Sequence, residues 1–333
     1  MRQGFNPNKD KPQQASEFWH QVVIPVYIPN SEDYFKDSFD ILKLCLESLK
    51  KTTHKATYIT VVNNGSGATV SDYLQAQLQS GVIHEVIHSP NIGKINAILK
   101  GVVGHDFDLV TITDADVLFH EHWQKATYEI FEAFPQAGAV APLSFPNFLK
   151  YFTGPVWTRF WLSKKLRFED VSDPESLKAF ADSINNEDYY KEAHLQKQLI
   201  LENNGVKAGV GSGHFVNTYR GSVFDPPAGK HSPFHLGGGS ETKFVDAPVV
   251  QAGGFRLSTL KGHASHMGNT LAPWMQDTVS KLVEQEGEIT KPVLKELPSA
   301  GYNGLLFKLI TRGPIWRFLL KRKGLSGAQA KQY

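Results

Sequence analysis

The sequence predicts an α/β protein with a Rossmann-like, doubly wound and mostly parallel sheet, followed by a helical insertion and C-terminal helices. Three observations predict this fold class. Apolar segments alternate with amphipathic helical patterns from residue 21 to about residue 146. The connections between them are short. The apolar segments are continuous runs, as expected for strands that are covered on both faces.

The elements can be justified in chain order. The first strand, 21–29, stops at a proline, and a helical pattern of apolar residues follows it through Leu49. The second strand ends in the polar turn NNGSG, and the second helix stops at Gly81. The remaining expected elements alternate in the same way: strands at 56–67, 82–90, 108–119 and 137–145, and helices at 70–81, 91–104 and 122–135.

The rhythm breaks after residue 146, which predicts five segments. Residues 1–18 read as a polar tail, and 19–146 as the first α/β half. Residues 147–204 have a charged helical pattern, and 205–270 are Gly-rich and irregular, as functional loops often are. Residues 271–333 return to helix and form a basic C-terminal segment.

Composition excludes several classes of protein. The 333 residues are 41% hydrophobic, which is enough for a sizeable core, and the net charge of +2 gives no reason to expect a nucleic-acid partner. Cys45 is the single cysteine, so no internal disulfide can form. No signal peptide or membrane span is recognisable, and a cytoplasmic location is expected.

The C-terminal segment carries no Asp or Glu after Glu296, while its Leu, Phe, Ile and Trp residues alternate with Lys and Arg. Two interpretations stay open for 301–323. The segment can lie on a membrane surface, which for a cytoplasmic protein is the inner face of the plasma membrane, or it can pack on the domain with a solvated basic face.

The stretch DLVTITDADVLF ends a buried strand with Asp114 and Asp116. Side chains two apart on a strand point to the same face, and ligands of such sheets bind at the carboxyl ends of the strands. A hard divalent cation, Mn²⁺ or Mg²⁺, between the two carboxylates would turn their repulsion into ligation of a diphosphate. A solvated turn is the alternative.

Together, VIPVY, NNGS, NIGK and DAD lie along one predicted sheet edge, and in this order they resemble the family 2 glycosyltransferases with the GT-A fold. The resemblance implies a nucleotide-sugar donor, with UDP favoured, and a glycan or lipid-linked glycan acceptor of the bacterial surface-polysaccharide type. It implies that the donor contacts Pro25, Tyr27, Asn63, Asn64, Asn91, Lys94, Asp114 and Ala115. The family usually has Asp where this chain has Asn64.

The resemblance also implies a catalytic base in an acidic motif downstream. Glu241 in GGGSETKF is the candidate that would accept the proton of the acceptor hydroxyl, and Asp246 is the fallback. Some GT-A enzymes use a later histidine as a metal ligand, for which His266 is the better match and His263 the second. His214 and Arg220 match acceptor-binding positions loosely.

Three alternatives remain at this point. In a haloacid-dehalogenase-like phosphatase, Asp114 would be the nucleophile and Asp116 the acid, but three strand–helix units precede DAD and no later acidic pair is found. Sugar-nucleotide pyrophosphorylases need a Gly-rich basic loop after the first strand, which IPVYIPNSEDYF is not. A non-catalytic module that binds nucleotide or glycan stays open, because NNGS and SET each have one acidic residue fewer than the family usually has.

Overall fold

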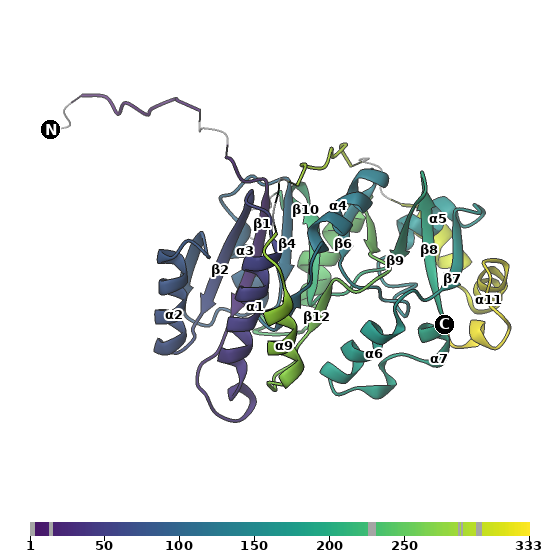
Figure 1. Cartoon of the computed structure of the whole chain (residues 1–333). Coiled ribbons are helices and arrows are strands. Elements are labelled where there is room, and N and C mark those ends of the chain that lie inside the picture. Colours follow the sequence, from purple (N-terminus) through teal and green to yellow (C-terminus); the bar gives the residue numbers. More distant parts are fainter. Residues whose placement is uncertain (1–3, 13–15, 226–230, 286, 288, 298–301) are drawn as a thin grey trace.

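Figure 1 shows the computed structural model, which describes residues 4–12, 16–225, 231–285, 287, 289–297 and 302–333. A ten-stranded sheet has the strand order β3-β2-β1-β4-β10-β6-β11-β9-β8-β7. In that order the strands are Glu85–Ser89, Thr57–Asn64, His20–Val26, Leu109–Thr113, Val216–Arg220, Ala137–Ala141, Phe255–Ser258, Val206–Val210, Lys197–Asn203 and Leu166–Asp170. A second sheet pairs β5 (Val117–Phe119) with β12 (Ala264–His266).

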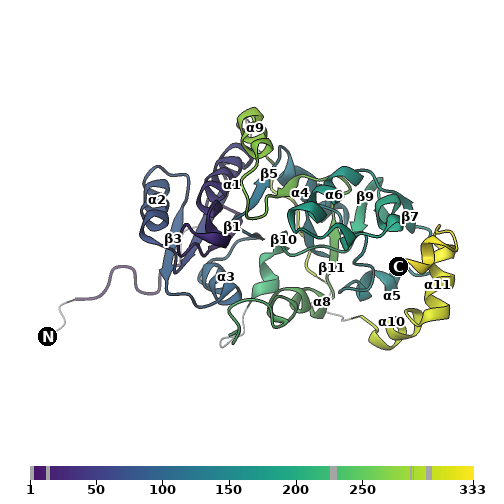
Figure 2. The same cartoon turned by 90° about the horizontal axis from the view of Figure 1, so that it is seen from below.

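Helices cover both faces of the large sheet. In chain order, α1 to α11 are Ser38–Thr52, Ala68–Gln79, Lys94–Val102, Trp123–Ala133, Gly154–Phe160, Pro174–Ser183, Glu192–Gln196, Ala247–Gln251, Pro273–Lys281, Gly304–Ile310 and Gly313–Arg322. Figure 2 shows α1 and α9 on one side of the sheet and α3 and α8 on the other. The predicted fold class is confirmed.

Alternate residues of β1 explain this double cover. Val22 and Ile24 belong to the buried cluster that contains α1, while Val23 belongs to the cluster that contains α3. All three side chains are fully buried. A strand buried on both faces needs apolar residues at every position, which is why its sequence is a continuous apolar run.

Strands β3, β2, β1 and β4 are parallel, and their order creates a reversal beside β1. The chain proceeds from β1 to β2 and β3 on one side, and then crosses to β4 on the other side of β1. In open α/β sheets, the crevice at such a reversal binds ligands at the carboxyl ends of the strands. Here those ends are the residues after Val26 and after Thr113.

Two features differ from the sequence expectation. The expected strand 108–119 is two strands, because β4 stops at Thr113 and β5 starts at Val117 in the second sheet. The segment 147–204 contains α5, α6 and α7, as expected, and in addition β7 and β8, which extend the large sheet by antiparallel pairing. Strand β10 enters antiparallel between β4 and β6.

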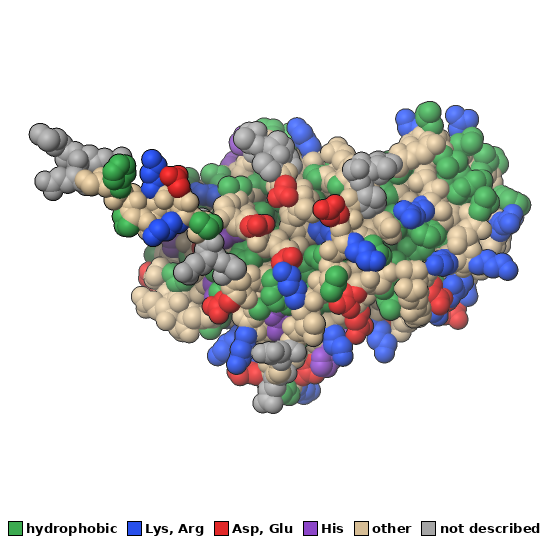
Figure 3. Space-filling view, turned by 90° about the horizontal axis from the view of Figure 1, so that it is seen from above, with side chains coloured by type: hydrophobic (Ala, Val, Ile, Leu, Met, Phe, Trp, Pro, Cys, Tyr) green, Lys and Arg blue, Asp and Glu red, His purple; other side chains and the backbone are tan. Residues whose placement is uncertain are grey.

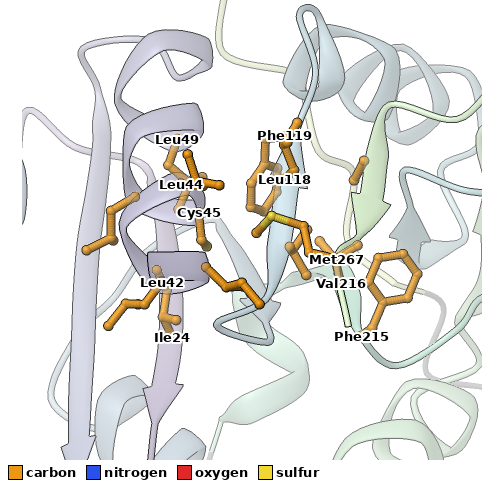
Figure 4. Packing of buried hydrophobic residues seen from close by; sticks show 14 of the residues in the cluster. Ile24, Leu42, Leu44, Cys45, Leu49, Leu118, Phe119, Phe215, Val216 and Met267 are labelled. Atoms are coloured by element: carbon orange, nitrogen blue, oxygen red, sulfur yellow. The ribbon is translucent and has the colours of Figure 1, made fainter. Parts of the chain in front are cut away.

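Cys45 lies on the buried face of α1 and points into the core, as the amphipathic pattern of this helix predicts. Figure 4 shows its side chain among Leu42, Leu49 and other apolar residues that face β5. Burial raises the pKa of the Cys45 thiol well above its usual value. The thiol is therefore a small packing residue that stays protonated, and it contributes nothing to chemistry.

The basic C-terminal segment forms α10 and α11, which pack against α5. Trp316 is buried, and its ring lies 4.6 Å from that of Trp157 on α5. Within the ranges that the structure describes, no helix has both the length and the apolar character that crossing a bilayer requires. Residue 301, the first residue of the segment 301–323 that was considered for a membrane surface, lies outside the described residues.

Candidate active site

The acidic pair lies in a turn between the two sheets. The Asp114 amide donates to the Phe215 carbonyl at 2.8 Å, just before β10. The Met267 amide donates to the Asp116 carbonyl at 2.8 Å, just after β12. The turn Asp114–Ala115–Asp116 is thus fixed from both sides by segments more than 90 residues downstream.

Both carboxylates line one cavity of about 440 Å³ at the reversal point of the sheet. The cavity runs from the end of β1 past the start of α3 to the acidic turn. Its polar and aromatic lining residues are Tyr27, Tyr34, Phe35, Ser38, Asn64, Asn91, Lys94, Asp114, Asp116, His235 and Asn269, and Pro25 and Ala115 also border it. No sequence motif pointed to Tyr34, Phe35, His235 or Asn269: the first two lie on the short 3-10 turn Asp33–Phe35, and the other two lie on irregular segments.

Asp116 is a buried carboxylate with unmet bonding capacity. Its Oδ1 atom is buried and has no hydrogen-bond partner in the described part of the chain. Burial raises the pKa of Asp116 to about 6; His266 opposes this shift, and the nearby negative charge of Asp114 adds to it. An uncompensated buried acceptor is costly, so this position favours a cation.

His266 presents a nitrogen to Asp116. Its Nε2 atom lies 3.4 Å from Asp116 Oδ2, and its Nδ1 atom lies 2.9 Å from Ser183 Oγ. The Ser183 hydroxyl donates to the Phe180 carbonyl at 2.7 Å, so Ser183 Oγ accepts from the Nδ1–H of His266. In the neutral ring this arrangement assigns the lone pair to Nε2, the nitrogen beside the carboxylate.

The nitrogen of His266 and the oxygens of Asp116 are suitable ligand atoms for a divalent metal ion. A neutral imidazole nitrogen and a carboxylate oxygen side by side are ligands for Mn²⁺, and the serine is the kind of partner that orients a ligating histidine. Among the described residues no three His, Cys, Asp or Glu side chains converge into a ready-made metal cluster. Asp116 and His266 would therefore hold the ion together with oxygens of the donor, as is common for Mg²⁺ and Mn²⁺.

His263 lies elsewhere. Its Nδ1 atom is 3.4 Å from the carbonyl of Glu121, and its backbone carbonyl accepts from the His120 amide at 3.0 Å. Between the two histidines considered from the sequence, His266 is the one that contacts the acidic turn.

Lys94 is the first residue of α3 and connects the acidic turn to Glu241. Its Nζ atom lies 2.6 Å from Asp114 Oδ1 and 3.3 Å from Glu241 Oε1. Burial lowers the pKa of Lys94, but Asp114 and Glu241 together raise it more, so the net shift is upward. Lys94 is a permanent cation that partly neutralises Asp114.

Gly93 allows the backbone turn that places Lys94. It has φ +89°, and a Cβ atom there would lie 2.7 Å from the Phe234 carbonyl. The Lys94 amide donates to the His235 carbonyl at 2.8 Å, which closes one wall of the cavity. A larger residue at position 93 would push this wall away.

The two asparagines after β2 have different positions. Asn64 lines the cavity, accepts from the Ile92 amide at 2.9 Å, and lies 3.4 Å from Asn91 Oδ1 through its Nδ2 atom. Asn63 is buried and donates to Ser71 at 2.9 Å while it accepts from the Ser66 amide. Asn63 therefore holds the turn in place and is not among the residues that line the cavity, so its donor contact stays a prediction.

Glu241 precedes an unusual helical turn. Residues Thr242–Asp246 form a π-helix that continues into α8. π-Helical turns are rare and occur frequently at functional sites. The Glu241 side chain is 29% exposed, so it can meet a second substrate while Lys94 keeps it close to the acidic turn.

Asp246, the fallback base, is the last residue of this π-helix, and its side chain is fully buried in a polar network. Its Oδ2 atom accepts from Tyr151 at 2.8 Å and lies 2.5 Å from His214 Nε2, and Arg256 Nη2 is 2.9 Å from Oδ1 as an ion pair. A carboxylate with three partners and no exposure is a poor base for an incoming hydroxyl. His214, in contrast, is partly exposed and oriented by Asp246.

Arg220 is a correction. It lies at the far end of β10, opposite Leu109, whereas Asp114 follows the other end of β4. Its buried guanidinium donates to the carbonyls of Ala137 at 2.6 Å, Pro135 at 2.9 Å and Lys295. Arg220 is a structural residue at the edge of the sheet opposite to the site, so the predicted acceptor contact is wrong.

Comparison with known proteins gives one family match. Residues 22–189, slightly more than half of the chain, match the family described as Glycosyl transferase family 2. None of the curated proteins compared matches the sequence.

Three solved structures illustrate the similarity in space. The mannosyltransferase PcManGT from Pyrobaculum calidifontis, in complex with GDP-Man and Mn²⁺, has 12% identity and a TM-score of 0.42 over 72% of this chain and 54% of its own. S. aureus TarS 1-349 in complex with UDP has 12% identity and a TM-score of 0.42 over 79% and 63%. Another TarS 1-349 structure has 14% identity and a TM-score of 0.31 over 38% and 35%. The chain spans less than two thirds of each.

Proposed function

The chain belongs to glycosyl transferase family 2, and from this premise we propose that it is a metal-dependent, inverting enzyme. It moves a sugar, of hexosyl type, from a nucleotide-sugar donor to a glycan or lipid-linked glycan. The observation that carries the proposal is the acidic turn, which lies at the reversal point of the sheet in one cavity with Lys94, while His266 lies beside Asp116.

The nucleotide would occupy the part of the cavity beside β1. The exposed ring of Tyr27 and the rings of Tyr34 and Phe35 offer apolar faces for a base and ribose. Asn64 and Asn91 offer amide groups that can pair with a pyrimidine ring, which supports a UDP-sugar. Lys94 and the start of α3 provide positive charge for the diphosphate.

Asp116 and His266 would hold Mn²⁺ or Mg²⁺. The ion, when bound, stabilises the negative charge that develops on the departing nucleoside diphosphate. Lys94 contributes a second positive charge, and its ion pair with Asp114 holds the lysine side chain in place.

Glu241 would act as the base. The acceptor oxygen attacks the anomeric carbon and its proton passes to the Glu241 carboxylate, while the bond from that carbon to the diphosphate oxygen breaks and the electron pair leaves with the nucleotide. Attack opposite the leaving group inverts the anomeric centre. The ammonium of Lys94 lies 3.3 Å from Glu241 Oε1 and would hold this carboxylate beside the acidic turn.

The test begins with a thermal-shift screen of nucleotide sugars with and without Mn²⁺, because a ligand that binds only the folded state raises the melting temperature. Release of nucleotide from the donor that binds is then measured with an acceptor mixture. Asp116→Ala should abolish release, and the exposed Asp106→Ala is the matched control.

Glu241→Gln should keep the donor-induced shift and lose transfer by at least about 100-fold, as general bases contribute that much or more. Full transfer by this variant would remove Glu241 from the mechanism. Donor binding without release by the wild-type protein would support the non-catalytic module, and hydrolysis of a simple phosphomonoester would support the phosphatase reading.

A further inference from the structure

Helices α10 and α11 bury one face and expose the other. Ile310, Trp316, Leu319 and Leu320 belong to the core cluster that includes α5 and β7. On the opposite side, exposed fractions are 81% for Leu305, 61% for Phe318, 48% for Leu309 and 38% for Ile315. Four large apolar side chains thus stand in water on two short consecutive helices, although the buried face already has its packing partners.

The same surface is strongly basic. Its exposed cations are Lys308, Arg312, Arg317, Lys321 and Arg322. The sequence has no acidic residue after Glu296, and none of these five forms an ion pair within the part of the chain that the structure describes. The whole chain is nearly neutral, at 35 basic against 33 acidic residues, so this excess is local.

This combined surface, the α10–α11 patch, lies at the end of the molecule away from the N-terminus (Figure 2). Figure 3 shows hydrophobic side chains and Lys or Arg side chains together at that end. Apolar side chains surrounded by cations, on helices that lie along the surface, are the composition that binds at the headgroup level of an anionic bilayer.

We propose that the α10–α11 patch docks the protein peripherally on an anionic membrane surface. Leu305, Leu309, Ile315 and Phe318 enter the acyl boundary, and the five cations meet the headgroups. A second copy fits the patch less well, because a symmetric contact would place its cations against each other. Nucleic acid would meet the cations but gives no partner to the aliphatic side chains.

The experiment is flotation of the full chain with vesicles of neutral phosphatidylcholine, with and without 30% phosphatidylglycerol as a chosen test composition. The apolar double variant Leu305→Ser/Phe318→Ser should bind the anionic vesicles at least about tenfold more weakly, because each side chain loses its transfer into the acyl region. The matched control is Val103→Ser, which removes an apolar side chain that is 76% exposed on α3's far end.

The charge variant is Arg312→Gln/Arg317→Gln/Lys321→Gln. We expect roughly a 100-fold loss, since each basic side chain near an anionic surface contributes about fivefold in affinity. The control is Lys55→Gln/Lys100→Gln/Lys125→Gln, three exposed lysines elsewhere. Circular dichroism and melting temperature, which should match the wild type, separate loss of docking from unfolding.

Equal binding to neutral and anionic vesicles, or variants that bind like their controls, would overturn the proposal. So would binding to duplex DNA that the charge variant loses and the apolar variant keeps, together with no vesicle binding. None of these readouts depends on glycosyl transfer, so their outcome is independent of the proposed activity.

Discussion

Replacing Lys94 with Met tests the electrostatics of the site. Lys94 is the common partner of Asp114, at 2.6 Å, and of Glu241, at 3.3 Å. Met has a similar length and no charge, so the variant leaves two partly buried carboxylates without their cation, next to Asp116. The loss is therefore electrostatic and not one of volume.

The magnitude follows from these contacts. Removing one partner of a buried ion pair costs about 3–5 kcal/mol, and the 20–29% exposure of the three side chains reduces this to about 2–4 kcal/mol. For a chain of this size, that corresponds to a fall in melting temperature of roughly 3–6 °C. Lys100→Met, on the exposed side of the same helix, should change the melting temperature much less.

Mn²⁺ supplies the second half of this test. In the wild type Lys94 occupies Asp114, so an added ion has Asp116 and His266 as its ligands and must compete with the lysine for Asp114, whereas in Lys94→Met the Asp114 carboxylate is free to join them. An ion at 100 times its Kd adds about 2.7 kcal/mol of stability, so Mn²⁺ should restore most of the loss in the variant and shift the wild type less.

The assay is differential scanning fluorimetry of both variants across a Mn²⁺ titration. A Lys94→Met protein that melts within about 1 °C of the wild type would refute the pairing, because the expected shift is several times larger. An equal Mn²⁺ response of variant and wild type would refute the competition between lysine and metal.

Three further outcomes follow from the structure. Arg220→Met should lower the free energy of unfolding by about 2–4 kcal/mol, because the carbonyls of Ala137, Pro135 and Lys295 lose their donor, and leave the thermal shift induced by the nucleotide sugar unchanged; a lost shift at unchanged stability would restore a binding role. Ser183→Ala should weaken Mn²⁺ binding about 10-fold, seen in a thermal-shift titration, because His266 loses the partner that fixes its tautomer; unchanged affinity would contradict that assignment. Burial lowers the pKa of His54 to about 4, so between about pH 6.5 and 4 the unfolded chain takes up a proton that the folded chain does not. The free energy of unfolding should therefore fall by up to about 1.4 kcal/mol per pH unit on acidification through this window. His54→Gln should flatten that slope, measured by urea unfolding at several pH values.

The first half of the fold could be predicted because its strands are buried on both faces. A run such as that of β1 has one stable environment, and the short connections leave a parallel sheet as the simplest arrangement. The strand break at Thr113 could not be predicted, because VTIT and VLF are both typical of buried strands and only the pairing of β5 with β12 separates them.

The site was predictable where it lies on element ends and unpredictable where it depends on loops. Asp114, Asp116, Lys94 and Asn64 follow or begin regular elements, so the sheet edge brings them together. Tyr34 reaches the same cavity from a short 3-10 turn, and His235 and Asn269 reach it from irregular segments, none of which has a recognisable sequence motif. Arg220 was misplaced because β10 is antiparallel to its neighbours, and strand direction cannot be read from a five-residue segment.

The acidic turn is anchored by the Phe215 carbonyl and the Met267 amide, and this sets the minimum length of a fragment that keeps the site intact. A fragment ending at residue 189, where the family match stops, would lack β10 and leave one edge of β4 with open amides and carbonyls. Such a fragment would expose an aggregation-prone strand edge. Its turn Asp114–Ala115–Asp116 would lack the two backbone hydrogen bonds, to Phe215 and from Met267, that fix it. Any shortened version intended for crystallisation or inhibitor screening must therefore continue at least through residue 267.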